Sequence, residues 1–204
     1  MSLYRRLVVP RLCDLAMRNA RLRPYRERVA GGATGRVLEI GAGSGLNLRL
    51  YRSGAREVFE LEPDPKLIAM AKRRAESATR PVRFLEASAE HIPLEDDSVD
   101  TVVTTWTLCS IPDAHKALQE MRRVLKPAGR LLFVEHGLAP ERNVRKWQNR
   151  LTPLWRRVSG GCHLNRPIDR IIREAGFAID TLETGYLAGP KVMTYLYEGS
   201  AQPR

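Results

Sequence analysis

The sequence predicts an α/β fold: a doubly wound, mostly parallel sheet of seven strands with an antiparallel hairpin at its carboxyl-terminal edge. Short apolar strand patterns alternate with helical patterns from Arg36 onward. Residues 131–134 are apolar throughout, as expected for a strand that is covered on both faces. Two further strand patterns follow Phe177 and surround Gly189-Pro190, a turn signal that favours a hairpin.

Local patterns give the order of the elements. Asp64, followed by a proline, and Asp113 are typical N-cap residues, and each predicts a helix that begins just after it. The amino-terminal residues 1–30 are also expected to be helical, with Leu3, Leu7, Leu12, Leu15 and Leu22 available for burial. The parallel strands are expected at residues 37–40, 57–61, 81–85, 99–104 and 131–134.

The chain has 204 residues, which fits one domain with a short extra layer. We expect a helical cap over residues 1–35 and a main domain over residues 36–204, with a helical lid segment at about 137–165. The three cysteines are Cys13, Cys109 and Cys162, and their odd number and wide spacing favour neither a disulfide framework nor a zinc site. Neither a signal peptide nor an apolar run of the about 20 residues that span a bilayer is present, so we expect a soluble, cytoplasmic protein.

The composition is basic, with 34 Lys and Arg residues against 23 Asp and Glu residues and a net charge of +11. A positive field of this size favours anionic partners, which include nucleic acid, an anionic membrane surface and an acidic substrate. A solvated basic surface without a partner is an equally good interpretation.

A glycine-rich segment, residues 41–45, follows the first expected strand and precedes an expected helix. Glycines let the backbone turn tightly and approach a ligand closely. Glu62 stands 21 residues beyond Gly41, at the end of the second strand, where a carboxylate can accept both hydroxyls of a ribose. Leu46 replaces the small residue of a dinucleotide fingerprint, and no lysine follows the glycines as in a P-loop. The pattern therefore predicts a nucleoside site that suits neither NAD nor ATP.

Residues 39–45, 62–63, 88–93, 98–100 and 125–129 resemble, in order and spacing, the motifs of class I S-adenosylmethionine methyltransferases. This resemblance covers about residues 36–136 and implies a Rossmann-like fold with S-adenosyl-L-methionine as the cofactor. It implies that the glycines pass under the methionine part, that Glu62 holds the ribose and that Ser88 and Ala89 meet the adenine. The cofactor-binding residues expected are Glu39, Gly41, Ala42, Gly43, Gly45, Asn47, Glu62, Pro63, Ser88, Ala89, Thr105 and Trp106.

Residues 105–110, 133–136 and 161–166 are similar to stretches of the methyltransferase-like 7 group of thiol methyltransferases, whose bacterial relatives are often labelled phospholipid N-methyltransferases. The resemblance implies a small or lipophilic acceptor, with a thiol as the first choice. The alternatives are an amine head group such as that of a phospholipid and, less favoured, nucleic acid. That group typically carries an amino-terminal hydrophobic anchor, and no such run is found in this sequence.

Methyl transfer from a sulfonium is an in-line displacement, so the protein mainly aligns the acceptor and excludes water. A thiol is only partly ionised at neutral pH, so a nearby base would help. His136, just past the fifth strand, is the candidate base, and a histidine bonded to loop backbone is the alternative. Trp106 is expected to line the cofactor or to pack in the core. Cys109 is expected to be a small buried hydrophobe, and Cys162 with its neighbour His163 is too short a cluster for a metal, so no metal site is predicted.

The lid segment carries Trp147 and Trp155 on one helical face and many arginines around the other. We favour a lid that packs both tryptophans over the acceptor. A helix on an anionic membrane surface and a peripheral helix packed on the sheet are the alternatives. The loop at residues 104–107 lacks the Asn/Asp-Pro-Pro-aromatic pattern of base-methylating enzymes, so no nucleic-acid partner is expected. A cofactor-binding scaffold without turnover is the non-enzymatic alternative.

Overall fold

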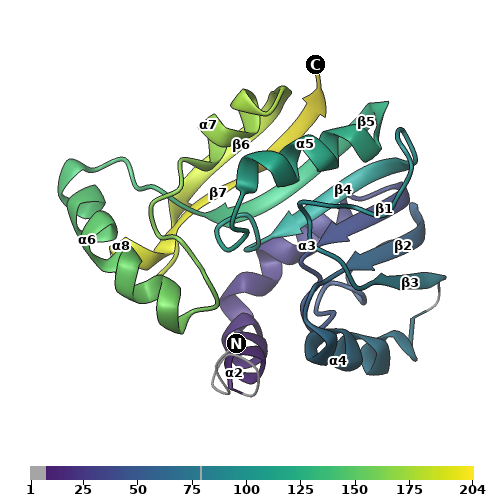
Figure 1. The fold of residues 1–204 in the computed structure, drawn as a ribbon, viewed down its shortest axis with the longest axis horizontal. Coiled ribbons are helices and arrows are strands. Elements are labelled where there is room, and N and C mark those ends of the chain that lie inside the picture. Colours follow the sequence, from purple (N-terminus) through teal and green to yellow (C-terminus); the bar gives the residue numbers. More distant parts are fainter. Residues whose placement is uncertain (1–7, 79) are drawn as a thin grey trace.

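A computed structural model describes residues 8–78 and 80–204. One sheet with the strand order β3-β2-β1-β4-β5-β7-β6 runs through the molecule (Figure 1). The first five strands are parallel to one another, while β7 runs antiparallel to both β5 and β6. Their bounds are β1 Gly35–Ile40, β2 Ala55–Leu61, β3 Val82–Leu85, β4 Val99–Thr105, β5 Leu125–His136, β6 Phe177–Tyr186 and β7 Tyr195–Pro203. The predicted fold class, including the antiparallel carboxyl-terminal hairpin, is confirmed.

The strand order changes direction at β1, which lies between β2 and β4. Ile40, the last residue of β1, pairs with Leu61 of β2 and Thr104 of β4, so the carboxyl ends of these strands lie side by side. In a doubly wound sheet this switch point is where ligands bind.

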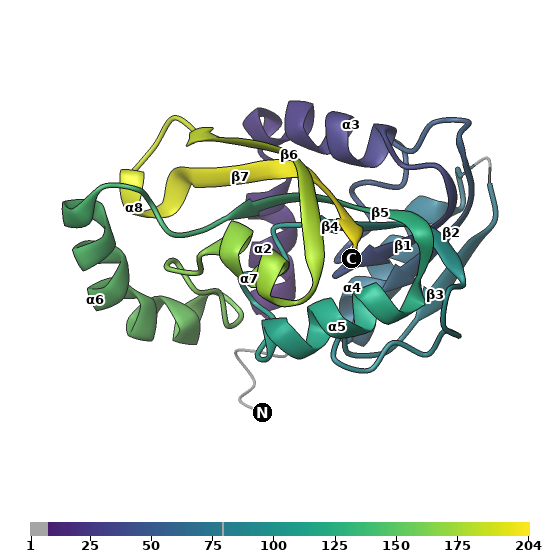
Figure 2. The same cartoon turned by 90° about the horizontal axis from the view of Figure 1, so that it is seen from above.

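Helices cover both faces of the sheet. α3 (Arg23–Gly31) lies on one face, and α5 (Ala114–Val124) and α7 (Ile168–Glu174) lie on the other (Figure 2). Successive strand side chains alternate between two cores: Val37 packs with α3, whereas Leu38 packs with α5 and α7. Both expected N-caps are confirmed, because Asp64 Oδ1 accepts the Lys66 N–H at the start of α4 (Pro65–Ala75) and Asp113 Oδ1 accepts the Lys116 N–H at the start of α5.

Two local expectations were wrong. The amino-terminal helix is broken into α2 (Val9–Met17), the 3-10 helix η1 (Ala20–Leu22) and α3, because Asn19 caps η1 and Pro24 lies in the first turn of α3. Leu12 and Leu15 are 49% and 68% exposed rather than buried, while Leu3 and Leu7 lie outside the described residues. The glycine segment leads into a run of turns over residues 43–50, not into a helix.

Two more helices lie beyond the end of the sheet. α6 (Arg142–Val158) forms the middle of the predicted lid segment and lies beside the short α8 (Lys191–Thr194) (Figure 1). The division into a cap at 1–35 and a main domain stays a prediction, although α3 packs directly on β4 and β5.

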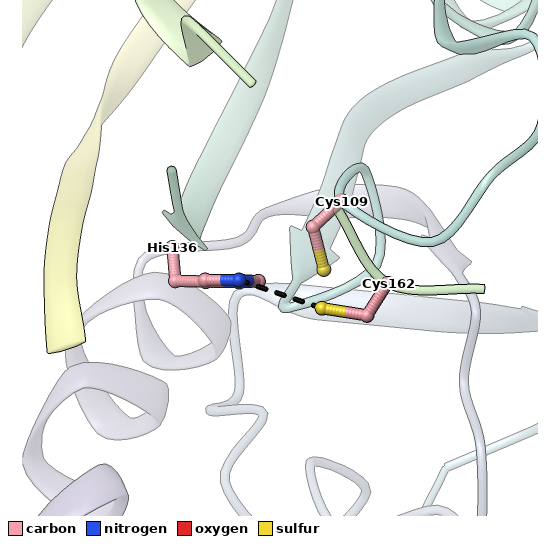
Figure 3. A group of neighbouring side chains, drawn as sticks. All are labelled: Cys109, His136 and Cys162. Carbon is pink, nitrogen blue, oxygen red and sulfur yellow. Dashed lines mark hydrogen bonds between the residues drawn. The ribbon is translucent and has the colours of Figure 1, made fainter. Parts of the chain in front are cut away.

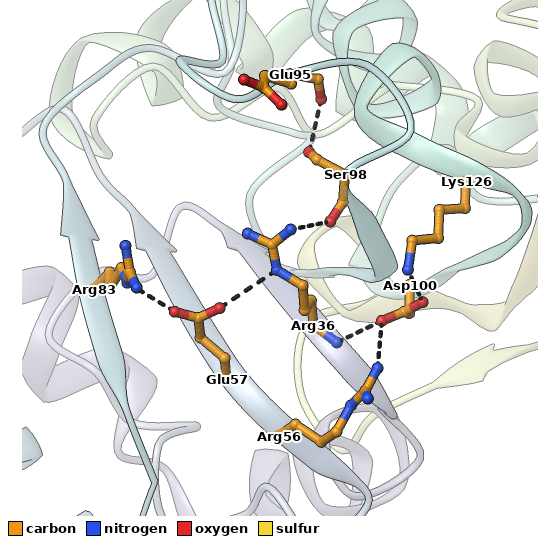
Figure 4. Close-up of polar contacts among 8 residues, drawn as sticks. All are labelled: Arg36, Arg56, Glu57, Arg83, Glu95, Ser98, Asp100 and Lys126. Atoms are coloured by element: carbon orange, nitrogen blue, oxygen red, sulfur yellow. Dashed lines mark hydrogen bonds and ion pairs between the residues drawn. The ribbon is translucent and has the colours of Figure 1, made fainter.

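The amino ends of the strands are joined by charged side chains (Figure 4). Asp100 at the start of β4 accepts the backbone N–H of Arg36 at 2.7 Å and the Lys126 ammonium at 2.6 Å. Arg56 adds a contact of 3.4 Å to the same carboxylate. Burial would raise the pKa of Asp100, but these hydrogen bonds outweigh burial and lower the pKa. The ionised carboxylate therefore connects β1, β2, β4 and β5 at the end of the sheet opposite the switch point.

We expect Asp100→Asn to lower the free energy of unfolding by about 1–3 kcal/mol, the usual cost of losing a hydrogen bond to a charged group. Because the native pKa is lowered, this stability is present above the unfolded pKa and is lost as the pH falls through the native pKa. Urea unfolding at neutral and acidic pH measures both effects, with the exposed Asp97→Asn as the control. Equal unfolding midpoints for Asp100→Asn and the wild type at neutral pH would contradict the assigned role.

Candidate functional site

The glycine segment forms a bend whose backbone only glycine adopts easily. Gly41, Gly43 and Gly45 have φ angles of 64°, 57° and 77°, in the left-handed region. A Cβ on Gly41 would lie 2.3 Å from Thr107 Cγ2, so this position must stay bare. A Cβ on Gly43 would meet nothing closer than 3.8 Å, so the bend has an open side there.

Glu62 faces this bend, as the sequence predicted. Its Oε2 accepts the Gly43 N–H at 2.9 Å and its Oε1 accepts the N–H of Asp64 at 3.0 Å. The side chain is 7% exposed, and burial raises its pKa against the opposing effect of these two hydrogen bonds. Each carboxylate oxygen has a further lone pair, so Glu62 can accept two more hydrogen bonds. Its neighbour Pro63 is exposed.

A buried polar network lies beneath the bend. Glu39 on β1 accepts hydrogen bonds from Asn47 at 2.7 Å and from the Tyr51 hydroxyl at 2.6 Å. Asn47 also donates to Thr105 Oγ1 at 3.1 Å. Arg26 on α3 donates to Asn47 Oδ1 at 2.9 Å, while its Nε is buried with no partner among the described residues. The predicted Glu39, Asn47 and Thr105 are thus brought together, and sequence reasoning missed Arg26 and Tyr51.

Trp106 follows β4 with a φ angle of 53°, an unusual conformation for an aromatic residue. Its backbone N–H donates to Val134 O at 2.8 Å, and the Arg26 guanidinium lies 5.0 Å from its ring centre.

Ser88 and Ala89 lie on the loop after β3. The Ser88 hydroxyl donates to Glu90 at 3.0 Å, and Ala89 is buried against the core. Their predicted contact with adenine stays a prediction.

The helix α2 is attached directly to the glycine bend. Ser44 Oγ donates to Asp14 Oδ1 at 2.5 Å, and Arg74 on α4 lies 3.0 Å from the same oxygen while also donating to Ser44 O. Arg18 contacts the other Asp14 oxygen. Burial would raise the pKa of Asp14, but Ser44 and the two arginines outweigh burial and lower it. This contact was not predicted, because Asp14 is separated from Ser44 by 30 residues and from Arg74 by 60 residues, and such distances give no signal in the sequence.

Two cysteines and a histidine meet at the same edge of the sheet (Figure 3). Cys109 follows β4, His136 ends β5 and Cys162 follows α6. Cys162 Sγ lies 3.4 Å from His136 Nε2, and one ligand atom from each residue falls within 4.8 Å of the others. No metal site was predicted here, because residues that are distant in sequence give no spacing signal.

This environment perturbs all three groups. Hydrogen bonds from Cys109 and His136 lower the pKa of Cys162 to about 4. The contact with Cys162, together with burial, raises the pKa of Cys109 well above its ordinary value. Burial would lower the pKa of His136, but Cys162 and Glu135 beside it outweigh burial and raise it. The nearby His163 instead bonds the backbone oxygen of Cys109 at 3.0 Å.

The tryptophans of α6 are placed differently. Trp147 is 55% exposed, so it does not cover the site in this structure, contrary to the lid expectation. The buried positions of α6 are Gln148 and Thr152, because Gln148 bonds the backbone of Gly137 and Ala139 and so turns this face inward. Trp155 is half-buried, and its indole N–H lies near Cys162, whose pKa it helps to lower.

Comparison with known proteins agrees with this geometry. Residues 38–133 match the sequence family described as a methyltransferase domain. Thiol S-methyltransferase TMT1B of Rattus norvegicus is 38% identical over 151 residues, which cover 72% of this chain and 62% of the relative. The chain therefore contains a methyltransferase domain at residues 38–133. It spans about three fifths of the length of that relative.

Solved structures share the fold at lower identity. A SAM-dependent methyltransferase from Aquifex aeolicus has a TM-score of 0.66 and 18% identity, covering 96% of this chain and 98% of its own. The [4+2]-cyclase SpnF has a TM-score of 0.69 and 21% identity, covering 95% of this chain and 80% of its own. A cyclase with this architecture shows that the fold alone does not decide the reaction of this methyltransferase.

The cofactor of this family is S-adenosylmethionine, and the residues present fit it. The open side of the bend at Gly43 admits a ligand close to the backbone, and the free lone pairs of Glu62 suit the two ribose hydroxyls. The unpartnered Nε of buried Arg26 suits the carboxylate of the methionine part. The assignment of each residue to a part of the cofactor is a proposal.

We expect Glu62→Ala to weaken S-adenosylmethionine binding about 10- to 100-fold, because hydrogen bonds to a charged group contribute about 1.5–3 kcal/mol. Glu62→Gln keeps one acceptor oxygen and should lose less affinity. Isothermal titration calorimetry measures the change, and Glu86→Ala, an exposed acid on a neighbouring loop, is the control. Unchanged affinity in Glu62→Ala would remove the ribose assignment.

Proposed function

We propose that this methyltransferase moves the methyl group of S-adenosylmethionine to the sulfur of a small, lipophilic thiol. The observation that carries the proposal is the shared edge of the sheet. The Glu62 carboxylate and the glycine bend lie at the ends of β1 and β2, and Trp106 and His136 lie next to them at the ends of β4 and β5. The choice of a thiol is supported by the 38% identity to a thiol S-methyltransferase.

The cofactor, when bound, supplies a methyl group that is already activated by a positive sulfur. The protein's own contribution is to hold the cofactor and the acceptor in line, which can supply about 7–11 kcal/mol of the barrier. Glu62 holds the ribose, the glycine bend lies beneath the methionine part, and the unpartnered Nε of Arg26 binds the methionine carboxylate. Trp106 lines the cofactor, with Arg26 on one face of its ring.

The acceptor must lose a proton, because the thiolate is the better nucleophile. His136 as the base remains a prediction from the sequence. In the structure its Nε2 lies 3.4 Å from Cys162 Sγ, so it would have to release Cys162 before taking a proton from an acceptor.

We expect a thiol to be methylated with a higher kcat/KM than the amine or alcohol of the same carbon skeleton. A panel of such matched compounds, with phospholipid vesicles included and isotope-labelled cofactor, measures the preference. Glu62→Ala protein controls for transfer that does not use the site. Faster methylation of the amine or of a phospholipid head group would replace the thiol assignment while leaving the cofactor site intact.

Two helices beside the site expose apolar side chains. Within the described part of the chain, the exposed large hydrophobic residues lie on α2, at its N-cap, or on α6: Val8, Leu12, Leu15, Trp147, Leu154 and Val158. The α6 surface also carries exposed basic residues, among them Arg150 and Arg157. No described helix has both the length and the apolar character needed to cross a bilayer. We propose that these two helices rest on an anionic membrane surface, from which a lipophilic acceptor can enter.

We expect the double variant Arg150→Gln, Arg157→Gln to bind anionic vesicles about 30-fold more weakly, since each basic residue near the surface contributes about 1 kcal/mol. The control is Arg170→Gln, Arg173→Gln, which removes the same charge from exposed positions of α7. Co-sedimentation at low salt measures the binding. If the wild-type protein stays in the supernatant, the membrane proposal is wrong.

A further inference from the structure

The cluster of Cys109, His136 and Cys162 has the dimensions of a metal site. In a tetrahedral zinc site, bonds of about 2.3 Å to sulfur and about 2.0 Å to nitrogen place a sulfur and a nitrogen about 3.6 Å apart and two sulfurs about 3.8 Å apart. The structure places Cys162 Sγ 3.4 Å from His136 Nε2, and all three ligand atoms lie within 4.8 Å of one another. A shift of about 1 Å or less would let them share one ion.

The chemistry of the three ligands favours zinc. Thiolate sulfurs and imidazole select zinc over magnesium or calcium, which prefer oxygen ligands. Two cysteines and one histidine form a known catalytic zinc set, in which a fourth position stays open for a water or a substrate. Cys109 and His136 are 2% and 7% exposed, so these two ligands are shielded from bulk water, while Cys162 is half-buried.

His163 and Glu135 are next to ligands in sequence, but neither belongs to the group of atoms that lie within 4.8 Å of one another. His163 Nδ1 contacts the backbone oxygen of Cys109 at 3.0 Å. Glu135 Oε1 accepts hydrogen bonds from Thr104 at 2.7 Å and from the Thr107 N–H at 2.9 Å. Within the described residues, the group that could hold an ion therefore consists of three protein ligands.

The cluster also lies next to the cofactor site. Cys109 Sγ is 3.6 Å from the backbone oxygen of Trp106, and Trp106 is joined to Arg26 of the buried network. Cys109 and His136 follow β4 and β5, whose carboxyl ends share the sheet edge with the glycine bend.

We propose that Cys109, His136 and Cys162 bind one Zn²⁺ whose open fourth position holds the sulfur of the acceptor thiol. The zinc site is inferred from its geometry alone. The binding of the acceptor thiol to the zinc ion rests on the proposed function. His136 is then a ligand of the ion and not the base.

The transfer step balances without a further reactant. The acceptor thiol releases its proton to solvent when its sulfur binds the ion. A lone pair of that sulfur forms the new bond to the methyl carbon. The bond between this carbon and the cofactor sulfur breaks, and its electron pair stays on that sulfur, which becomes neutral. The product is a neutral thioether, a weaker ligand than a thiolate, and it leaves the ion.

Zinc binding is tested without any assay of activity. Reduced, chelator-treated protein is titrated with Zn²⁺ by calorimetry, and with Co²⁺ to record the thiolate charge-transfer and tetrahedral d–d absorption. We expect one equivalent of either metal to bind. Cys162→Ser and His136→Gln should each weaken the affinity at least about tenfold. The matched controls Cys13→Ser and His115→Gln, which change residues outside the cluster, should bind like the wild type. Circular dichroism checks that each variant folds.

Several results would overturn the site: no stoichiometric binding, equal affinity in the cluster variants and the controls, or a Co²⁺ spectrum without thiolate charge transfer. Methylation of a thiol at the full rate by metal-free protein would overturn the role of zinc in the transfer, while thiol methylation itself would stand. One equivalent of zinc with no thiol methylation would instead remove the proposed function and the acceptor's place at the ion. The zinc site itself would then be supported.

Discussion

The site depends on how the glycine bend is tied to the end of β2. The backbone N–H groups of Gly41 and Ala42 both donate to Leu61 O, and the N–H of Gly43 donates to the Glu62 carboxylate. These contacts hold the bend against the neighbouring strand whether or not a ligand is bound. Thr107, just past β4, lies against Gly41 so closely that any side chain there would collide with it. The ends of β1, β2 and β4 are therefore held together at one edge of the sheet, and β5 pairs with β4 beside them.

Local patterns in the sequence predicted this edge well. Parallel strands covered on both faces are apolar, and the caps Asp64 and Asp113 satisfy backbone N–H groups within the first turn, so both signals act over a few residues. Glu62 was placed correctly because a carboxylate at the end of a strand next to a glycine bend has few other directions to face. A helix was expected after Gly45, because Leu46 and Leu50 are four residues apart, as on one face of a helix. The structure has turns there instead.

The contacts that the sequence did not reveal all join distant segments. Asp14 meets Ser44 and Arg74, and Cys109 meets residues that follow it by 27 and 53 positions. Such proximity is set by how the helices pack on the sheet, not by spacing along the chain. Trp147 was expected to be buried, because it lies on an apolar helical face, but its side chain is exposed. The side of α6 that turns inward is instead decided by Gln148, whose amide bonds the backbone of the β5–α6 loop.

A buried charge connects the amino-terminal helices to the polar network beneath the glycine bend. Glu39 and Glu60 are register partners on β1 and β2, and both are at most 1% exposed. Burial and the nearby Glu39 raise the pKa of Glu60 well above its ordinary value, and burial also raises the pKa of Glu39. Glu39 accepts hydrogen bonds from Tyr51 and Asn47. The nearby charge of Arg26 acts against this effect of burial on the pKa of Glu39. A buried carboxylate is stable only when it is paired and hydrogen-bonded. Because Arg26 comes from α3, a helix that precedes β1 places a positive charge beside this carboxylate.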